Sequence, residues 1–579
     1  MDVQFIIESF FCMLGRFDFD RAKVYIDGKK EVLQKLAPTF PNQYQLMAML
    51  TTFSHLAEVE KNYHNQPFPV NQSQSHHSFL PTTNFLRKTK TLREMYNDIF
   101  SELQQLEQLE SNAVTSKKTK NDLSPSSTKS YILTSLNDNV NTSSSQHHSP
   151  GQSSHTQQTL AKLHNKQSGG STSSGDQQSS NSSSTDKDSP VTHVPQSPST
   201  AFRNSFFKVL SPVSGSTIQS PNNSFSNHNP YSSSSGSGID APPNSTNTTP
   251  VTNTLNMREF SEKLISHFCM QLQAFVQARL DMIDVYEKLT EELGMKVASV
   301  DGIAFRLSML CRQYHKYFHH PLLAPIKEGM TLECESLMTL IRATIDIQHW
   351  RFLPSLFDLQ EAQSKLNYWA ASTFNKEATK RRFKVSKTQT APRLYEWLCK
   401  FREFLGAKFT LYFHAILSKS FPPNNFKSSC SRLSIDYYAK LSSFQRKVDA
   451  VFIALMYDVS NEKDFRGIGY QYPSRDCQQP QGKNTLQPMI VIPAESKTKL
   501  NSLQAEIYMT AMTNQQVMMK GLYQFHDNIK KLTYSMTKPD FNVVLVIVCD
   551  GQRSDRDSNV RGFTQEISNL FSFSNIFPT

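Results

Sequence analysis

Apolar residues recur at steps of three and four along most of the chain outside its serine-rich middle. In the opening segment this spacing joins Phe5, Ile6, Phe10 and Leu14. Such a stripe is typical of one face of an α-helix packed on a core. The segment 43–64 repeats the pattern with Leu46, Met49, Leu50, Phe53, Leu56 and Ala57. Both segments are therefore predicted to be amphipathic helices.

The same periodicity predicts a series of further helices. They are expected at residues 85–111, 257–294, 300–319, 331–350, 354–381 and 393–419. The segment 257–294 covers about ten turns and ends at Gly294, a residue suited to the position after a helix. Consecutive helices with apolar stripes and short connections are typical of an all-α bundle. We predict one helical bundle made from residues 1–110 and 256–423.

Beyond about residue 424 the pattern changes to short β-branched and apolar runs. Strands are predicted at 451–459, 489–494, 505–512, 532–537 and 542–550, and helices at 514–531 and 559–571. The sequence KPDFN between the last two runs favours a β-hairpin. This order fits an antiparallel sheet with helices on one face. Residues 424–579 are therefore expected to form an α+β domain.

A polar segment, residues 111–255, separates the two parts of the predicted bundle. Ser, Thr, Asn, Gln, Gly and Pro dominate it, and apolar residues are almost absent. Such a segment cannot bury enough apolar surface to offset its ordering entropy, so it is predicted to be a disordered insert. The island AFRNSFFKVL (Ala201–Leu210) is either a residual sticky patch or a docking motif.

Composition and charge exclude few classes of protein. The chain has 579 residues, and 61 basic against 50 acidic residues give a net charge of +11. A basic chain is compatible with nucleic acid or an anionic membrane, but the excess requires neither. The eight cysteines stand singly, without a CxxC pair, which indicates reduced thiols of an intracellular protein. We see no secretory signal and no membrane-spanning apolar run, so a soluble or peripheral protein is expected.

The histidine-rich stretch YHKYFHHPLLAP (Tyr314–Pro325) is the first candidate for chemistry. His315 and His319 have the i, i+4 spacing of an HExxH zinc helix, but no Glu follows the first histidine and no third ligand is evident. Pro321 disfavours helical geometry at His320, so we predict that the helix ends around His319–His320. Histidines in a last turn interact favourably with the helix dipole. They are interpreted as helix-end residues.

The remaining candidates are weaker. The loop CDGQRSDRD (Cys549–Asp557) carries three aspartates without the spacing of a calcium loop, and Asp557 or Ser558 is expected to cap the last helix. RGIGYQYP (Arg466–Pro473) has two glycines without a phosphate-loop context, and KRRFKVSK (Lys380–Lys387) is the densest basic patch. No catalytic, cofactor-binding or metal-binding residue is predicted.

Several long motifs together resemble the KICSTOR subunit 2 family. They run in order along nearly all of the chain outside the insert: FFCMLGRFDFDRAK, HLAEVEKNYH, FVQARLDMIDVYEK, FHHPLLAP, WRFLPSL, LYEWLCKFREFLGAKFTLYFH, KLSSFQRKVDA and GQRSDRDSNVRGFTQEIS. Their length and unusual composition make the resemblance specific. The chain departs from the family in its insert, which is far longer than the family's linker at this point.

The resemblance implies a non-enzymatic scaffold subunit, without cofactors, of a KICSTOR-like complex at the lysosomal membrane. Its implied partners are a kaptin-like protein, an integrin-alpha FG-GAP repeat protein and a very large seizure-threshold scaffold protein. Such a complex recruits the GATOR complex and so represses mTOR complex 1 when amino acids or glucose run out. The family is also linked to cilium assembly. The element order of residues 424–579 is similar to roadblock or longin domains, which is an analogy of fold alone.

Two alternatives remain open at the level of sequence. One is a metal-dependent hydrolase that uses His315 and His319, or the Asp550–Asp557 loop. The other is a basic adaptor for nucleic acid, for which no recognition module is present, so no nucleic acid is expected as a partner. Bound zinc or calcium would favour the first alternative, and steeply salt-dependent binding to RNA or DNA the second.

Overall fold

The computed structural model describes residues 3–35, 43–66, 90–118, 251–294, 300–374, 391–462, 465, 479–554 and 557–577. Several sequence-based predictions concern residues outside these ranges. They are the island at 201–210, the basic patch at 380–387, the glycines at 466–473, and the part of the predicted disordered insert 111–255 that covers residues 119–250. Those predictions stay as stated above. The two ends of that insert, 111–118 and 251–255, were wrongly predicted, because they belong to helices.

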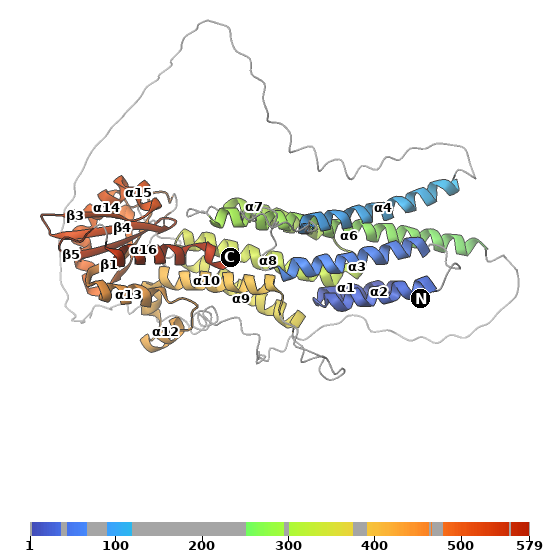
Figure 1. Ribbon diagram of the computed structural model, residues 1–579, viewed down its shortest axis with the longest axis horizontal. Coiled ribbons are helices and arrows are strands. Elements are labelled where there is room, and N and C mark those ends of the chain that lie inside the picture. Colours follow the sequence, from blue (N-terminus) through green and yellow to red (C-terminus); the bar gives the residue numbers. More distant parts are fainter. Residues whose placement is uncertain are drawn as a thin grey trace, which may run out of the picture. The chain divides into compact units, whose positions relative to one another are not determined.

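Helices make up the first part of the fold (Figure 1). The described helices are α1 (Val3–Gly15), α2 (Phe19–Lys35), α3 (Gln43–Asn65), α4 (Leu92–Lys118), α6 (Val251–Gly294), α7 (Asp301–Tyr317), the 3-10 turn η2 (Pro321–Leu323), α8 (Ala324–Gln348), α9 (Phe352–Phe374), α10 (Arg393–Tyr412), α11 (His414–Ser420) and α12 (Pro423–Cys430). The helices predicted in this region are present with shifted ends, except that the one predicted at 393–419 is two helices, α10 and α11, which meet at Phe413. The prediction missed α2, because only Phe19, Ala22, Ile26 and Leu33 of that helix are buried.

Aromatic packing joins helices from both sides of the insert. The rings of Phe10 in α1 and Phe53 in α3 stack with their centroids 5.0 Å apart. Phe11 of α1 meets Phe268 of α6 edge-on at 5.8 Å. A close approach also occurs at Gly15, where an added Cβ would lie 2.6 Å from the Pro325 Cβ of α8. Segments far apart in the sequence therefore share one apolar core. The borders 1–110, 256–423 and 424–579 remain a proposed division.

Five strands form a sheet in which every neighbouring pair is antiparallel. The order across the sheet is β2-β1-β5-β4-β3. The sheet lies in the orange-to-red, C-terminal part of the chain in Figure 1. The strands and their helices are α13 (Tyr437–Val448), β1 (Ala450–Asp458), β2 (Leu486–Ile492), α14 (Lys497–Thr513), α15 (Gln515–Lys520), β3 (Tyr523–Asp527), β4 (Leu532–Asp540), β5 (Val543–Asp550) and α16 (Ser558–Phe571), followed by the 3-10 turn η6 (Phe573–Ile576). The α plus α+β fold class predicted from the sequence is confirmed. The predicted hairpin is β4–β5, turning at Phe541 and Asn542.

The prediction that helices cover one face of the sheet is wrong, because both faces are covered. Met456, Val546 and Met536 point to a core shared with Leu503 and Ile507 of α14. Leu455, Leu545 and Ile547 lie in the larger core with α13, α16 and the helical bundle. Every residue of β5 from Val543 to Cys549 is buried, as expected for a strand that is covered on both sides.

Two elements of the sheet domain also differ from prediction. Residues 505–512 were expected to be a strand but belong to helix α14, whose buried residues Leu500, Leu503, Ile507 and Ala511 recur at helical spacing. Residues 514–531 were expected to be a helix but hold only the short α15 and then strand β3. All five residues of β3 are half-buried, so this edge strand lacks the alternation that identifies a strand in the sequence.

The helical bundle and the sheet domain meet around one buried lysine. Lys408 of α10 is 1% exposed, and its Nζ lies 2.5 Å from the Asp540 Oδ2 at the end of β4. The hydroxyl of Tyr412 also donates a hydrogen bond to Asp540. The Lys408 Nζ lies 4.6 Å from the ring centroid of Phe573, a cation–π distance. This contact fixes α10 against the β4–β5 turn.

Candidate functional site

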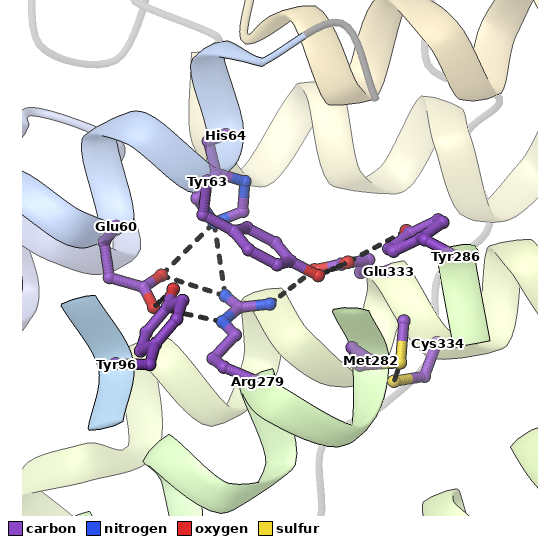
Figure 2. Close-up of polar contacts among 9 residues, drawn as sticks. All are labelled: Glu60, Tyr63, His64, Tyr96, Arg279, Met282, Tyr286, Glu333 and Cys334. Carbon is purple, nitrogen blue, oxygen red and sulfur yellow. Dashed lines mark hydrogen bonds and ion pairs between the residues drawn. The ribbon is translucent and has the colours of Figure 1, made fainter. Parts of the chain in front are cut away.

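The most unusual group of side chains in the described residues is a charged network inside the helical bundle (Figure 2). Glu60 comes from α3, Arg279 from α6 and Glu333 from α8, and they are 3%, 2% and 0% exposed. Charged side chains are almost never this buried unless they are paired. We call this group, together with Tyr63, His64, Tyr96 and Tyr286, the Arg279 network.

Arg279 is the centre of the network. Its Nε lies 3.1 Å from Glu60 Oε1 and its Nη2 3.0 Å from Glu60 Oε2, which is a bidentate pair. Its Nη1 donates to Glu333 Oε2 at 2.6 Å. The guanidinium also lies over the Tyr63 ring, 4.4 Å from its centroid. One cation thus pairs with two carboxylates and satisfies its own donors in three directions.

Tyrosine hydroxyls complete the hydrogen bonding of the two carboxylates. Tyr63 and Tyr286 donate to Glu333 Oε1 at 2.5 and 2.9 Å, and Tyr96 donates to Glu60 Oε1 at 2.7 Å. Burial, followed by the charge of the adjacent carboxylate, raises the pKa of all three phenols well above the ordinary value. The tyrosines therefore stay protonated and act as fixed donors.

Glu60 and Arg279 stay charged around neutral pH. Burial opposes the ionisation of Glu60, but Arg279 and the hydrogen bonds from His64 and Tyr96 outweigh it and lower its pKa to about 2. Burial also opposes the charge of Arg279, yet the two glutamates raise its pKa well above the ordinary value. A group that neither gains nor loses a proton near pH 7 is a poor general acid or base. The network is built to hold helices in register.

The predicted helix end at the histidines is wrong by two residues. Helix α7 ends at Tyr317, and His319 and His320 lie beyond it, before η2. The Nδ1 of His320 accepts a hydrogen bond from the Leu322 backbone N–H at 3.2 Å, so His320 caps η2 rather than α7. Pro321 directs the chain into this new turn. Only His315 lies in the last turn of α7.

The histidines do not assemble into a ligand set with acids or cysteines. The rings of His319 and His320 lie 5.8 and 5.7 Å from the ring of His267 in α6, measured between centroids. Burial, and then the two neighbouring histidines, lowers the pKa of His320. Within the described residues there is no group of three or more His, Cys, Asp or Glu side chains arranged to hold a metal ion.

The acidic loop after β5 is a connection that starts a helix. Gly551 turns the chain with a φ of +73°, and Asp557 caps α16 by accepting hydrogen bonds from the backbone N–H groups of Asn559 and Val560. The prediction of this cap is confirmed. Arg553 donates to the Val448 carbonyl at 3.0 Å and lies 3.9 Å from Asp557. Asp555 lies outside the described residues.

Sequence reasoning missed a pair of carboxyl groups on neighbouring helices. Asp346 of α8 and Asp358 of α9 are hydrogen-bonded to each other, flanked by Arg351 at 3.4 Å and Arg342 at 3.2 Å respectively. Burial, and then the Asp346 carboxyl, raises the pKa of Asp358 to about 6 against the opposing charge of Arg342. The two aspartates lie on different helices with the α8–α9 connection between them, so no spacing rule for a single helix identifies the pair.

A hollow of about 470 Å³ lies between α3 and α4. It has an apolar floor and a charged rim, made by Glu58, Val59, Lys90, Met95, Asp98, Ile99 and Glu102 among others. None of the histidines or aspartates singled out in the sequence lies there.

A separate finding is that no helix in the described part of the chain is long and apolar enough to cross a membrane.

The fold is that of an α plus α+β protein. Its buried charged side chains, those of the Arg279 network, bind one another and hold helices α3, α6 and α8 together. The chain belongs to the family described as KICSTOR complex C12orf66 like, whose model matches residues 2–134 and 245–579. It is 31% identical over 321 residues to KICSTOR subunit 2 of Xenopus laevis, covering 55% of this chain and 72% of the relative. It is 30% identical over 309 residues to KICSTOR subunit 2 of Danio rerio, covering 53% and 69%.

Proposed function

We propose that this chain is a non-enzymatic scaffold subunit of a KICSTOR-like complex that recruits the GATOR complex. In this role it represses mTOR complex 1 when amino acids or glucose run out. The observation that carries the proposal is the family match, which covers both folded regions and omits residues 135–244. A scaffold acts through contact area, and it needs stable surfaces rather than a reactive group.

The complete burial of the charged Arg279 network supports this function. Arg279 and its two glutamates are sealed inside the bundle, where they cannot meet a substrate but can stiffen the helices that present a surface. The proposed partners are a kaptin-like protein, an integrin-alpha FG-GAP repeat protein and a very large seizure-threshold scaffold protein. Attachment to the lysosomal membrane would occur through these partners. A contribution to cilium assembly is the further role that we propose from the family.

The test uses cells that lack the protein. Phosphorylation of a TOR substrate should remain high in these cells during amino-acid starvation, and the full-length chain should restore the shut-off. Phe305 and Phe357 are 70% and 60% exposed on α7 and α9, and large exposed aromatics often anchor interfaces. We expect Phe305→Glu or Phe357→Glu to reduce recovery of the partners in an affinity pull-down, and with it the rescue.

The matched controls are His315→Ala and Asp550→Ala, which remove candidate chemical groups without changing an apolar surface. Both should rescue fully. Thermal melting of each variant would separate lost contacts from unfolding. Normal TOR shut-off in the cells that lack the protein would contradict the proposal. A folded His315→Ala variant that keeps its partners but fails to rescue would favour the hydrolase alternative.

A further inference from the structure

Helices α7 and α8 bring two cysteines to one small cavity. Cys311 of α7 is half-buried and Cys334 of α8 is buried, and neither is in a disulfide. Both line a cavity of about 60 Å³, together with His315, Lys327 and Glu335 among others. That volume is room for one or two water-sized molecules. The half-exposed thiol is thus reachable by a small oxidant, and the buried thiol lies behind it.

The two thiols are inequivalent. A hydrogen bond between them is the largest influence on both; it lowers the pKa of Cys311 and, with burial, raises that of Cys334 well above the ordinary value. Cys311 is therefore the more acidic of the two thiols, and it is also the more exposed one. The Cys334 sulfur lies 3.5 Å from the Met282 sulfur of α6, as Figure 2 shows. Thiolate character together with access decides which cysteines react with oxidants.

We propose that Cys311 and Cys334 form a peroxide-sensitive redox site, in which Cys311 is the reacting thiol and Cys334 the resolving thiol. This inference rests on the cavity and on the pairing of the two cysteines across α7 and α8. It does not depend on the proposed scaffold function.

The chemistry balances with hydrogen peroxide as the oxidant. The Cys311 thiolate attacks one peroxide oxygen, the O–O bond breaks, and the departing hydroxide takes a proton to leave as water. Cys311 is then a sulfenic acid. The Cys334 sulfur attacks the Cys311 sulfur, the S–O bond breaks, and the hydroxyl group leaves with the Cys334 proton as a second water. Two thiols are oxidised by two electrons, and one peroxide is reduced.

The site is placed to transmit oxidation to the bundle interior. Cys334 directly follows Glu333, which binds Arg279 at 2.6 Å. A bond from Cys334 to Cys311 would tie α8 to α7 one residue from the Arg279 network. Oxidation would therefore act on the part of the bundle that the network holds in register.

The test is peptide mapping of the purified full-length chain after treatment with hydrogen peroxide and blocking of free thiols. Trypsin releases Cys311 in LSMLCR (residues 307–312) and Cys334 in EGMTLECESLMTLIR (residues 328–342). We expect these two peptides to be linked, and the link to disappear with dithiothreitol. In Cys334→Ser the sulfenic acid has no resolving thiol, so labelling of Cys311 by dimedone should rise several-fold over the wild type.

Cys399 provides a matched control, because it is also half-buried but burial raises its pKa to about 12. Cys311 should react at least about tenfold faster than Cys399, since a higher thiolate fraction outweighs the lower nucleophilicity of a more acidic thiol. Equal reactivity of the two, or wild-type Cys311 that is oxidised without linkage to Cys334, would overturn the proposal. The wild-type map decides the matter even if the Cys334→Ser variant does not fold.

Discussion

The helical bundle and the sheet domain bury different kinds of core. On one face of the sheet, the core consists of apolar side chains of β1, β4 and β5 with those of α14 and α15. At the same depth the bundle holds Arg279 and two glutamates. Leaving any of these charges unpaired would cost several kcal/mol, so helix registers that separate them are penalised. The bundle joins segments on both sides of a long insert, and its polar network is specific for one arrangement of them.

The strongest test of this difference between the two cores is the substitution Arg279→Met. The variant keeps most of the side-chain volume but leaves Glu60 and Glu333 buried without a cation. We expect a loss of about 3–5 kcal/mol in the free energy of unfolding, measured by urea denaturation followed by circular dichroism.

Arg306→Met is the matched control, because Arg306 also pairs with a carboxylate, Asp284 at 3.1 Å, but both side chains are about one-third exposed. This change should cost less than about 1 kcal/mol. Equal losses in the two variants would show that depth in the bundle does not decide the worth of an ion pair. The network would then be an ordinary surface-like contact.

The second prediction concerns the pH dependence of the Asp346–Asp358 pair. The folded protein raises the pKa of Asp358 from 3.8 to about 6, so the native state holds a proton that the unfolded state releases. The stabilisation is fully present below about pH 3.8 and is lost as the pH rises through about 6. Asn at this position is neutral throughout. Relative to the wild type, Asp358→Asn should therefore gain about 1–2 kcal/mol between pH 4.5 and pH 7, after allowance for solvent screening.

Urea denaturation of both proteins at the two pH values measures this difference directly. Glu8→Gln, a change at an exposed position of α1, should show no such gain. A constant difference between Asp358→Asn and the wild type across the range would mean that the folded protein does not raise the pKa of Asp358.

The sequence predicts those parts of the fold that have one strong periodicity. Helix α3 and strand β5 were identified because their apolar residues follow a helical stripe or a continuous run. Helix α14 was missed because Ile507 and Tyr508 favour a strand locally, while its helical signal begins at Leu500, outside the segment considered. Strand β3 was missed because an edge strand buries neither face fully. Tertiary position, rather than local preference, decided both cases.

The polar sites were less accessible to sequence reasoning. Glu60 lies on the apolar side of α3, three residues after the buried Ala57, and a charge at such a position signals a buried partner. The sequence cannot say that the partner is Arg279, since 219 residues separate them. The same holds for Cys311 and Cys334, which a scan for CxxC pairs does not join. Motif spacing finds sites within one element, whereas these sites form between elements.

The smallest expected effect on stability comes from shortening the insert. This change tests whether the two parts of the bundle are held together by their packed contacts rather than by the chain that connects them. The family match omits residues 135–244, and the Arg279 network already joins α3 and α4 to α6 and α8. If those contacts hold the bundle together, the connection between α4 and α6 needs only sufficient length. A Gly/Ser linker of about 20 residues has a mean reach of roughly 25 Å.

Replacing residues 119–250 with such a linker should leave the melting temperature within about 2 °C of the wild type, because a change in loop length alters the closure entropy by only a fraction of a kcal/mol per doubling. Scanning calorimetry should show one cooperative transition in both proteins. A broadened or split transition in the shortened chain would mean that the insert contributes contacts of its own. The same linker replacement in the Arg279→Met variant separates the contribution of the Arg279 network from that of the insert. Additive losses of stability would show that the network, and not the connecting chain, keeps the two parts of the bundle together.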